Sequence, residues 1–382
     1  MLNGIKEKRV GFVLIYNEDW LGGLNYFKNL FSILIDNEDL NIVPVVFTNN
    51  KKISKYLEND KILIVECKCL ERSNFVWMIN KIISRIFDYN ICLNYFFYKY
   101  NVDIISHNFI EGSRLPQIGW IPDFQHKYLK NLFSNKEMVY RDSIFKKYFE
   151  KCNLVLLSSE TAKKDAEVYY NEYRDKCRVL KFVSNIDLSK YNRDILKKYS
   201  INKPFFYLPN QFWQHKNHKL VLKALLEIRD ENILIVCTGN TNDYRNLNYF
   251  KEIKQFIKKY KLDSNFLILG IVPLEDVYSL MIECKAIIQP SLFEGWSSIV
   301  EEAKVLNKKI ILSDIDVHLE QNPTNGIYFS SNNVKDLAEK ILTVWNEDDK
   351  FILDIHEIEK RCKMNQRLEA IDYRRIIDEI GC

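Results

Sequence analysis

Two glutamates eight residues apart are the strongest chemical feature of this chain. Glu294 lies in the segment QPSLFEGWSSIVEEAKV, after a short apolar run, and Glu302 lies in the helix that this segment predicts. Side chains on a helix lean toward its N-terminus, so we expect Glu302 to face the loop that carries Glu294. A carboxylate accepts hydrogen bonds from two hydroxyls at once, so such a pair is suited to the diols of a sugar or a ribose. A solvated acidic helix start is the alternative interpretation.

The residues between the two glutamates predict a helix N-terminus that is suited to anions. Gly295, Trp296 and Ser297 lead into the helix, and their N–H groups would lie at its positive end, where phosphate oxygens bind. Gly295 permits a close approach of the backbone to a ligand. We also predict a capping box between Ser298 and Glu301, in which the glutamate reaches back to the start of the helix.

Two further segments carry candidate residues. Lys216, in PNQFWQHKNHKLVLKAL, follows an apolar strand and precedes a helix, where it would neutralise a phosphate or serve as an ordinary surface cation. Asp123 and His126 lie three residues apart in WIPDFQH, and the histidine is suited to a polar contact or to proton transfer near neutral pH. A structural role is the alternative for this histidine.

Glycines mark two more positions where a backbone could approach a ligand. Gly22 and Gly23 are predicted in a loop between the first strand and the first helix, although a tight turn would explain them as well. Gly270 ends a predicted strand in LILGIVPLED, where an ordinary turn is again the alternative.

The elements that must position these residues alternate between strand and helix, which predicts parallel doubly wound sheets. A polar segment at 184–204 separates two such sets, so we predict domains at 1–190 and 191–364, with a ligand cleft between them. Residues 75–100 predict a long helix or a helix pair that faces the core, with an amphipathic helix on a membrane surface as the alternative. Strands are predicted at 10–16, 42–48, 62–67, 102–107, 154–157, 179–183, 205–208, 233–237, 266–269, 286–288, 310–312 and 326–329.

The composition excludes several classes of protein. Hydrophobic residues make up 47% and charged residues 28% of the 382 positions, as in globular domains. A net charge of +4 is too small to indicate nucleic acid as a partner. The chain has no apolar stretch that would span a membrane and no signal-peptide pattern at its start. Nine cysteines without a Cys-x-x-Cys spacing indicate reduced thiols, so we expect a cytoplasmic protein.

The run PSLFEGWSSIVEEAK resembles the nucleotide-sugar signature of family-4-like retaining glycosyltransferases of the GT-B fold, in which two glutamates are separated by seven residues. The resemblance implies two Rossmann-like domains that face each other across a cleft, and a C-terminal helix near 365–382 that packs back on the first domain. It implies that Glu294 contacts the donor sugar and that Glu302 contacts the ribose. It also implies that Lys216 neutralises the diphosphate and that the base lies near Gly270 and Val272.

One position departs from the pattern of the resembled family. The family has an arginine five residues before the lysine, and Gln211 occupies that position here. A glutamine donates hydrogen bonds but carries no charge, so His215 or a more distant cation would have to compensate. The resemblance also places His126 beside the donor sugar, with Asp123 in the same segment.

An Asp-x-Asp sequence at Asp314 and Asp316 matches the motif that binds Mn²⁺ in the other large glycosyltransferase fold. It follows a strand of the second domain, so we interpret it as a loop and a helix cap. We therefore expect no metal site and no cofactor other than the nucleotide-diphosphate sugar that serves as donor substrate.

These observations predict a retaining, metal-independent glycosyltransferase that moves a sugar from a nucleotide-diphosphate sugar to a glycan or a lipid-linked acceptor. The resemblance implies synthesis of a bacterial surface polysaccharide such as O-antigen, capsule or exopolysaccharide. A nucleotide-sugar epimerase of the same fold is one alternative, and a catalytically silent sugar-binding partner of a polysaccharide assembly is another.

A basic and aromatic segment at 125–149 suggests a peripheral contact with an anionic membrane on its cytoplasmic face. A solvated helical face beside the acceptor is the alternative interpretation. The cations of this segment are Lys127, Lys130, Lys136, Arg141, Lys146 and Lys147.

Overall fold

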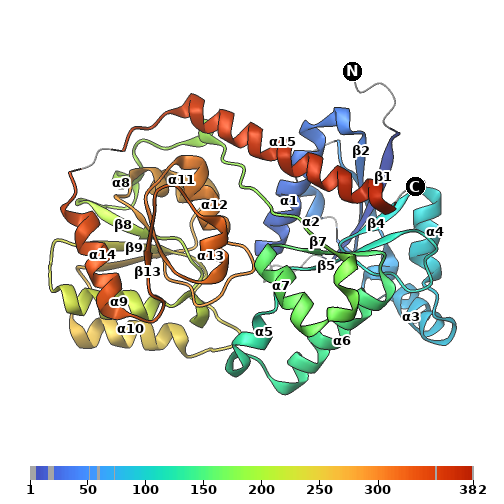
Figure 1. Cartoon of the computed structure of the whole chain (residues 1–382), viewed down its shortest axis with the longest axis horizontal. Coiled ribbons are helices and arrows are strands. Elements are labelled where there is room, and N and C mark those ends of the chain that lie inside the picture. The colour runs from blue at the N-terminus through green and yellow to red at the C-terminus, as the bar shows by residue number, and fades with distance from the viewer. Residues whose placement is uncertain are drawn as a thin grey trace. The chain divides into compact units, whose positions relative to one another are not determined.

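The chain forms two compact units, each built on a parallel β-sheet (Figure 1). The computed structural model describes residues 6–15, 21–50, 52–57, 61–72, 74–348 and 351–380. The first unit comprises Met1–Phe124, Lys136–Phe182 and Met364–Cys382, and the second comprises Gln125–Asn135 and Val183–Lys363. The short segment Gln125–Asn135 is thus grouped with the second unit, whereas the sequence analysis assigned it, with the rest of 1–190, to the first.

The first unit contains, among the described residues, a seven-stranded sheet in the order β3-β2-β1-β4-β5-β6-β7. All neighbouring strands are parallel. Strand β1 lies inside the sheet and is apolar and buried from Val10 onward, as expected where helices cover both faces of a sheet. The strands are β1 (Lys8–Leu14), β2 (Ile42–Thr48), β3 (Leu63–Glu66), β4 (Ile104–Ser106), β5 (Gln117–Ile121), β6 (Leu154–Leu157) and β7 (Cys177–Val179).

Helices of the first unit connect these strands, and the last helix of the chain adds to its core. Tyr373, Ile376 and Ile377 of that last helix are buried in the same apolar cluster as Phe12 of β1. The helices are α1 (Leu21–Asp36), α2 (Lys52–Leu57), α3 (Phe75–Phe87), α4 (Ile91–Lys99), α6 (Asn135–Lys151), α7 (Glu160–Tyr169) and α15 (Ile355–Ile380), of which the residues from Met364 onward are grouped with this unit.

The second unit repeats this architecture with a six-stranded sheet in the order β10-β9-β8-β11-β12-β13, again of the described residues. The strand order reverses between β8 and β11, and ligands of open α/β sheets bind beyond the carboxyl ends of the strands at such a point. The strands are β8 (Phe205–Leu208), β9 (Leu234–Thr238), β10 (Phe266–Gly270), β11 (Ile287–Gln289), β12 (Ile310–Ser313) and β13 (Gly326–Phe329).

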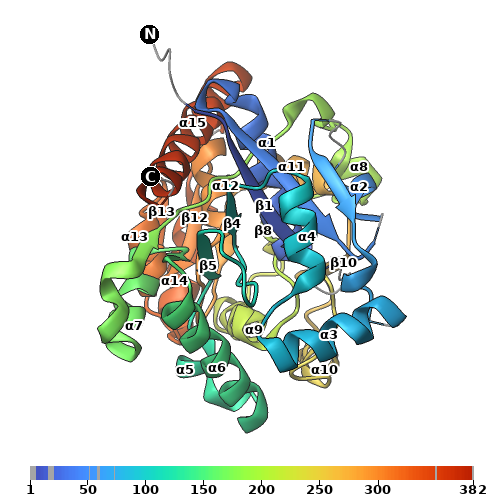
Figure 2. The same ribbon diagram turned by 90° about the vertical axis from the view of Figure 1, so that its right-hand side faces the viewer.

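Short and long helices surround this second sheet (Figures 1 and 2). Their inward faces meet the strands in two apolar clusters, which contain Phe206 and Ile288 on one side and Tyr207 and Ile287 on the other. The helices are α5 (Gln125–Tyr128), α8 (Ile195–Lys198), α9 (His218–Ile228), α10 (Tyr249–Tyr260), α11 (Leu274–Glu283), α12 (Ser298–Leu306), α13 (Asp316–Gln321) and α14 (Val334–Asn346).

The predicted alternation of strands and helices, and with it the α/β fold of two doubly wound sheets, is confirmed. Four predicted strands, 42–48, 154–157, 205–208 and 326–329, have the observed bounds. The strand predicted at 179–183 is wrong in position, because β7 ends at Val179. Tyr16, at the end of the first predicted strand, lies outside the described residues.

Two predictions in the first unit need correction. Gly22 and Gly23 do not lie in a loop but in the first turn of α1, while the preceding residues 17–20 lie outside the described residues. The segment 75–100 is a pair of helices, and the expectation that it faces the core is wrong for α3, which has no buried residue. Only α4 buries apolar side chains, those of Leu93 and Phe97.

Candidate active site

The loop that leads from β11 into α12 carries the central candidates. Helix α12 begins at Ser298, with Ser297 as its N-cap, and the cap side chain makes no capping hydrogen bond. The predicted capping box is therefore wrong. The Glu301 carboxylate instead accepts a hydrogen bond from Gln321 Nε2 at 2.9 Å and lies 3.1 Å from Lys304 Nζ. The Glu301 side chain therefore does not cap the start of the helix.

Lys216 and Glu294 form an ion pair across the point where the strand order reverses. Lys216 ends a short 3₁₀ turn after β8, and Glu294 lies in the loop after β11. Lys216 Nζ lies 2.6 Å from Glu294 Oε1, and the two side chains are only 15% and 10% exposed. The two loops are also joined by the Leu292 N–H, which donates to the carbonyl oxygen of His215 at 2.8 Å. Lys216, which was predicted to bind the diphosphate, and Glu294, which was predicted to bind the sugar, thus lie in one cluster.

A buried amide network fixes the position of Glu294, and sequence reasoning missed it. Gln289, the last residue of β11, is fully buried, and its Nε2 lies 3.0 Å from Glu294 Oε1 and 3.1 Å from Ser297 Oγ. Asn210, after β8, donates to Gln289 Oε1 at 2.6 Å. A glutamine directly after the apolar pair Ile287 and Ile288 was the signal in the sequence, because a polar side chain at the end of a buried strand requires partners.

Glu302 lies inside the protein without a counter-charge. Its residue is 8% exposed, and its Oε2 atom has no hydrogen-bond partner among the described residues. Burial disfavours the charged form and raises the pKa of Glu302 to about 8. Buried polar atoms in folded proteins almost always have partners. An orphaned carboxylate oxygen of this kind fits a site that is completed by the hydroxyl donors of a ligand.

The N-terminus of α12 offers fewer N–H groups than the sequence suggested. The N–H of Ser297 donates to Gln321 Oε1 at 3.3 Å, and Gln321 Nε2 donates back to the Ser297 carbonyl oxygen at 2.9 Å. This N–H is therefore occupied in the structure. Gly295 is half-buried in the preceding turn, and the Trp296 side chain is buried beside it.

His215 cannot compensate for the missing arginine at Gln211. Burial, together with the neighbouring charges of Lys216 and Arg245, holds the pKa of His215 well below its usual value, so this ring is neutral at pH 7. His215 therefore does not supply a positive charge at this pH, and compensation by a more distant cation stays a prediction. Gln211 is half-buried in the turn after β8. The backbone at Gly239 approaches this turn closely, because a Cβ atom on Gly239 would lie 2.8 Å from the Cα atom of Gln211.

Arg245 is a cation in the loop after β9 that sequence reasoning did not single out. Its guanidinium lies 5.0 Å from the ring centre of Phe133 and 5.3 Å from that of Trp213, and its Nη1 donates to Gln125 Oε1 at 2.5 Å. These contacts attach the segment Gln125–Asn135 to the loop after β8. The signal in the sequence was weak, because Arg245 lies in an asparagine-rich polar loop without a recognisable motif.

His126 lies on the segment that Arg245 contacts. It is two residues before Tyr128, which contacts the loop that carries Glu294. It is 1% exposed in α5, with its ring 6.3 Å from that of Phe133. The ring of Tyr128 lies 5.3 Å from that of Phe293, the residue before Glu294. Asp123 is grouped with the first unit, where its Oδ1 lies 3.9 Å from Arg141 Nη1.

Gly270 is the last residue of β10, and Val272 follows in the loop after it, at the same edge of the sheet. Gly270 has a φ of +72°, a conformation that favours glycine, and its carbonyl oxygen accepts a hydrogen bond from the Gly239 N–H at 2.8 Å. A Cβ atom on Gly270 would meet nothing within 4 Å, so the space beside it is open. Gly22, in α1 of the first unit, also has open space around it, whereas Gly23 is buried.

His318 is a further buried residue that the sequence analysis passed over. Its Nδ1 lies 2.9 Å from the carbonyl oxygen of Ser313, which only accepts hydrogen bonds, so Nδ1 carries the proton. Nε2 is then an acceptor, and it has no partner among the described residues. Burial lowers the pKa of His318 to about 4, although the nearby charge of Glu294 opposes this shift. The ring is therefore neutral beside the Lys216 and Glu294 pair.

The Asp-x-Asp sequence has structural partners. Asp314 Oδ1 accepts the Ser331 N–H at 2.8 Å, and Asp316 is the first residue of α13. Within the described part of the chain, no group of three or more His, Cys, Asp or Glu side chains is arranged to hold a metal ion.

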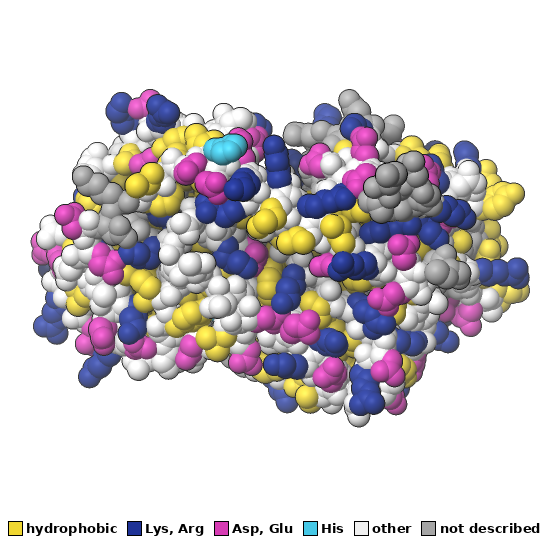
Figure 3. All heavy atoms as spheres, turned by 45° about the horizontal axis from the view of Figure 1, so that its top comes forward, with side chains coloured by type: hydrophobic (Ala, Val, Ile, Leu, Met, Phe, Trp, Pro, Cys, Tyr) yellow, Lys and Arg dark blue, Asp and Glu magenta, His cyan; other side chains and the backbone are white. Residues whose placement is uncertain are grey.

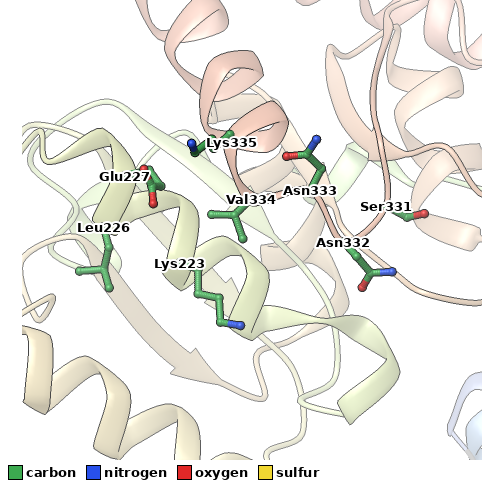
Figure 4. A pocket seen from close by; sticks show the side chains of 8 residues that line it. All are labelled: Lys223, Leu226, Glu227, Ser331, Asn332, Asn333, Val334 and Lys335. Atoms are coloured by element: carbon green, nitrogen blue, oxygen red, sulfur yellow. The ribbon is translucent and has the colours of Figure 1, made fainter.

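A separate hollow of about 520 Å³ lies between α9 and the start of α14 (Figure 4). Lys223 and Glu227 line it from α9, and Asn332, Asn333 and Lys335 line it from the other side. None of the predicted site residues takes part in it, so it is distinct from the cluster around Glu294.

The fold as a whole matches solved glycosyltransferases. A glycosyltransferase from Rickettsia africae ESF-5 superposes with a TM-score of 0.69 at 19% identity over 98% of both chains. Anabaena Alr3699/HepE, solved with UDP and glucose, superposes with a TM-score of 0.67 at 15% identity over 98% of this chain and 97% of that one. The two doubly wound sheets therefore define a GT-B fold.

The sequence is also similar to a family of glycosyltransferases. Residues 189–369 match the model of the family Glycosyl transferases group 1. The chain is also 25% identical over 225 residues to the O-antigen chain mannosyltransferase RfbU of Salmonella typhimurium, over 59% of each chain.

A second curated relative comes from Campylobacter jejuni. It is an N,N'-diacetylbacillosaminyl-diphospho-undecaprenol alpha-1,3-N-acetylgalactosaminyltransferase, 25% identical over 220 residues, which are 52% of this chain and 57% of that one. The matched segments thus span less than three fifths of the length of these relatives.

Proposed function

We propose that this protein is a retaining glycosyltransferase that moves a sugar from a nucleotide-diphosphate sugar to a glycan or a lipid-linked acceptor in surface-polysaccharide synthesis. The observation that carries the proposal is the charged cluster at the carboxyl edge of β8 and β11. Lys216 and Glu294 are paired there, and Glu302 lies buried on the helix that follows. This cluster lies at the point of the second unit where open α/β sheets bind ligands.

In this proposal Lys216 acts on the leaving group. Negative charge grows on the diphosphate as its bond to the sugar breaks, and a lysine that is mostly shielded from water stabilises that charge most in the transition state. Lys216 meets these conditions, because its side chain is 15% exposed and is held in place by Glu294. A cation in this position also makes a metal ion unnecessary, so we propose a metal-independent reaction.

Glu294 is assigned to the sugar as a hydrogen-bond acceptor rather than as a nucleophile. Its Oε1 atom already accepts from Lys216 Nζ at 2.6 Å and from Gln289 Nε2 at 3.0 Å. A carboxylate oxygen with two donors is a weakened nucleophile but a well-oriented acceptor, and Oε2 of the same group has no protein partner among the described residues. Retention without a covalent intermediate on Glu294 is consistent with this arrangement.

Glu302 is assigned to the ribose of the donor. Two vicinal hydroxyls would donate to its carboxylate and supply the partner that Oε2 lacks. We further propose that the base lies beside the open space at Gly270, and that the hydroxyls of the sugar reach the acceptor nitrogen Nε2 of His318.

The proposal is tested by incubating the full chain with a panel of nucleotide-diphosphate sugars and measuring the free nucleoside diphosphate. A transferase releases nucleotide slowly by hydrolysis and faster when a suitable acceptor glycan is added. An epimerase would convert the sugar without releasing nucleotide. A silent sugar-binding protein would bind a donor and release nothing, and either of these results would overturn the proposal.

A further inference from the structure

Helix α3 exposes an apolar stripe to the solvent. Phe75, Met78, Ile79, Ile82 and Ile86 follow one another at intervals of three or four residues, so they lie on one face of the helix. Their side chains are between 40% and 67% exposed. Isolated apolar residues are common on protein surfaces, but a continuous helical stripe of five marks an interaction site.

The inward face of α3 is mixed in polarity. Its half-buried residues are Trp77, Asn80, Ile83 and Ser84. Asn80 Nδ2 donates to Asn90 Oδ1 at 3.1 Å, and Asn80 Oδ1 accepts the Cys92 N–H at 3.2 Å. No residue of α3 is fully buried, so the helix turns its five-residue apolar stripe toward the solvent, whereas a helix of this kind usually turns such a stripe toward the core.

The charges of α3 indicate which partner this is. Lys81 and Arg85 lie one turn apart beside the apolar stripe, and neither forms an ion pair within the described part of the chain. Helix α3 contains no acidic residue, and Asp88 is its C-cap. An amphipathic helix with cations at the edge of an apolar face fits an anionic lipid surface, where the apolar face enters the acyl boundary and the cations meet the head groups.

The neighbouring helix α4, drawn next to α3 in Figure 2, also exposes large side chains. Ile91, Tyr95 and Tyr98 are spaced along one face and are 49%, 58% and 84% exposed. Tyrosines are favoured at the boundary between lipid and water, because one end of the ring is apolar and the other is polar. In Figure 3, hydrophobic side chains gather at the right-hand edge, the end where Figure 1 draws α4.

The basic segment at 125–149 is a poorer candidate for the same contact. Lys146 and Lys147 are paired with Glu150 and Glu111, and Arg141 lies near both Asp123 and Glu137. These acids cancel much of the positive field that an anionic membrane would attract. The sequence-based prediction for that segment therefore has less support than α3.

We propose that α3, together with the exposed face of α4, binds the surface of an anionic lipid bilayer. The α3 stripe supplies the apolar contact, Lys81 and Arg85 supply the charge, and the half-buried face of α3 stays attached to the first unit. The binding requires no nucleotide sugar, so it stands or fails independently of the enzymatic activity.

The test is co-sedimentation of the full chain with phosphatidylcholine vesicles, with and without phosphatidylglycerol. We expect binding to the anionic vesicles that weakens with salt, and much weaker binding to the neutral ones. The double variants Ile79→Ser with Ile82→Ser, and Lys81→Gln with Arg85→Gln, should each bind about tenfold more weakly or worse. All four side chains are exposed, so the fold should persist.

Two matched controls make the assignment specific. Val168→Ser with Leu247→Ser removes two apolar side chains elsewhere that are even more exposed than Ile79 and Ile82, and Lys146→Gln with Lys147→Gln removes two cations from α6. Both should bind vesicles like the wild type. The proposal is overturned if the α3 variants bind like the wild type or if only the α6 variant loses binding. It is also overturned if the wild type ignores vesicles but forms an oligomer that the Ile79 and Ile82 variant dissociates, because a second copy would then cover the stripe.

Discussion

Helices α12 and α3 break the usual rule of burial in opposite directions. Glu301 and Glu302 of α12 are 3% and 8% exposed, although charged residues normally lie on the surface. Ile82 and Ile86 of α3 are 54% and 67% exposed, although a helix normally turns such residues toward the core. Each exception is costly in water, and each is explained if the helix meets something other than water or its own chain.

The difference between the two helices teaches how each partner is recognised. In α12 the protein prepares directional acceptors inside a network, with Gln289, Gln321 and Lys216 holding the carboxylates around the loop. Such a site suits a small ligand with many hydroxyls and phosphates. Helix α3 instead presents an exposed apolar area and positive charge without directional hydrogen-bond partners, which suits a fluid lipid surface. The following predictions test this contrast, from the largest expected effect to the smallest.

Lys216→Ala should lower the turnover of donor by roughly 10²–10³-fold, with a smaller effect on the Michaelis constant, because the lost charge acts mainly in the transition state. Lys219→Ala is the matched control, since Lys219 lies three residues later on α9 and pairs with Glu252 instead. Steady-state kinetics of both variants check the prediction. Equal turnover in the Lys216 variant and the control would remove Lys216 from the reaction.

Glu302→Gln should change the dependence of stability on pH. The folded chain holds a proton on Glu302 up to a pKa of about 8, whereas the unfolded chain releases it near 4.5. The folded state therefore binds more protons between these values, and this group makes the protein less stable as the pH rises, by at most about 1.4 kcal/mol per pH unit. The variant should lack this loss. Urea unfolding of variant and wild type at several pH values between 5 and 8 gives the difference, and parallel curves would contradict the buried, protonated state.

Ile82→Ser should change the free energy of unfolding by no more than about 0.5 kcal/mol, because this side chain is largely exposed in α3. Val300→Ser in α12 should cost about 2 kcal/mol or more, because Val300 is fully buried. Chemical denaturation of the two variants measures both values. A large loss for Ile82→Ser would show that the apolar stripe serves folding, and the contrast between the helices would disappear.

The alternating pattern of the chain was sufficient to predict the two sheets and most of their strands, because short apolar runs bounded by polar turns are typical of buried strands. The loop between β11 and α12 was also predictable, since Pro290 and Gly295 interrupt the pattern there. The bounds of short strands at a sheet edge were harder to predict. The predicted strand at 179–183 is displaced because β7 pairs with a single neighbour, so few contacts determine its bounds.

The orientation of α3 could not be predicted, for a physical reason. Helical periodicity shows that one face is apolar, but it does not show on which side the protein lies. The hydrogen bonds of Asn80 to Asn90 and to Cys92 decide this, and they depend on the packing of two helices. The network around Glu294 was missed for a similar reason. Gln321 reaches Ser297 and Glu301 from 20 or more residues away, and no local pattern reveals such a contact.

The central claim is that the cluster at β8 and β11 binds a nucleotide through the buried carboxyl group of Glu302, and calorimetric titration with free nucleoside diphosphates tests it most directly. For the nucleotide that the wild type binds, Glu302→Gln should weaken binding by roughly 0.5–1.5 kcal/mol, the net value of a hydrogen bond between uncharged groups, because burial keeps Glu302 protonated at pH 7. Glu301→Gln should bind nearly as well as the wild type, since that carboxylate is engaged by Gln321 and Lys304. Unchanged affinity in Glu302→Gln, or an equal loss in both variants, would contradict the account.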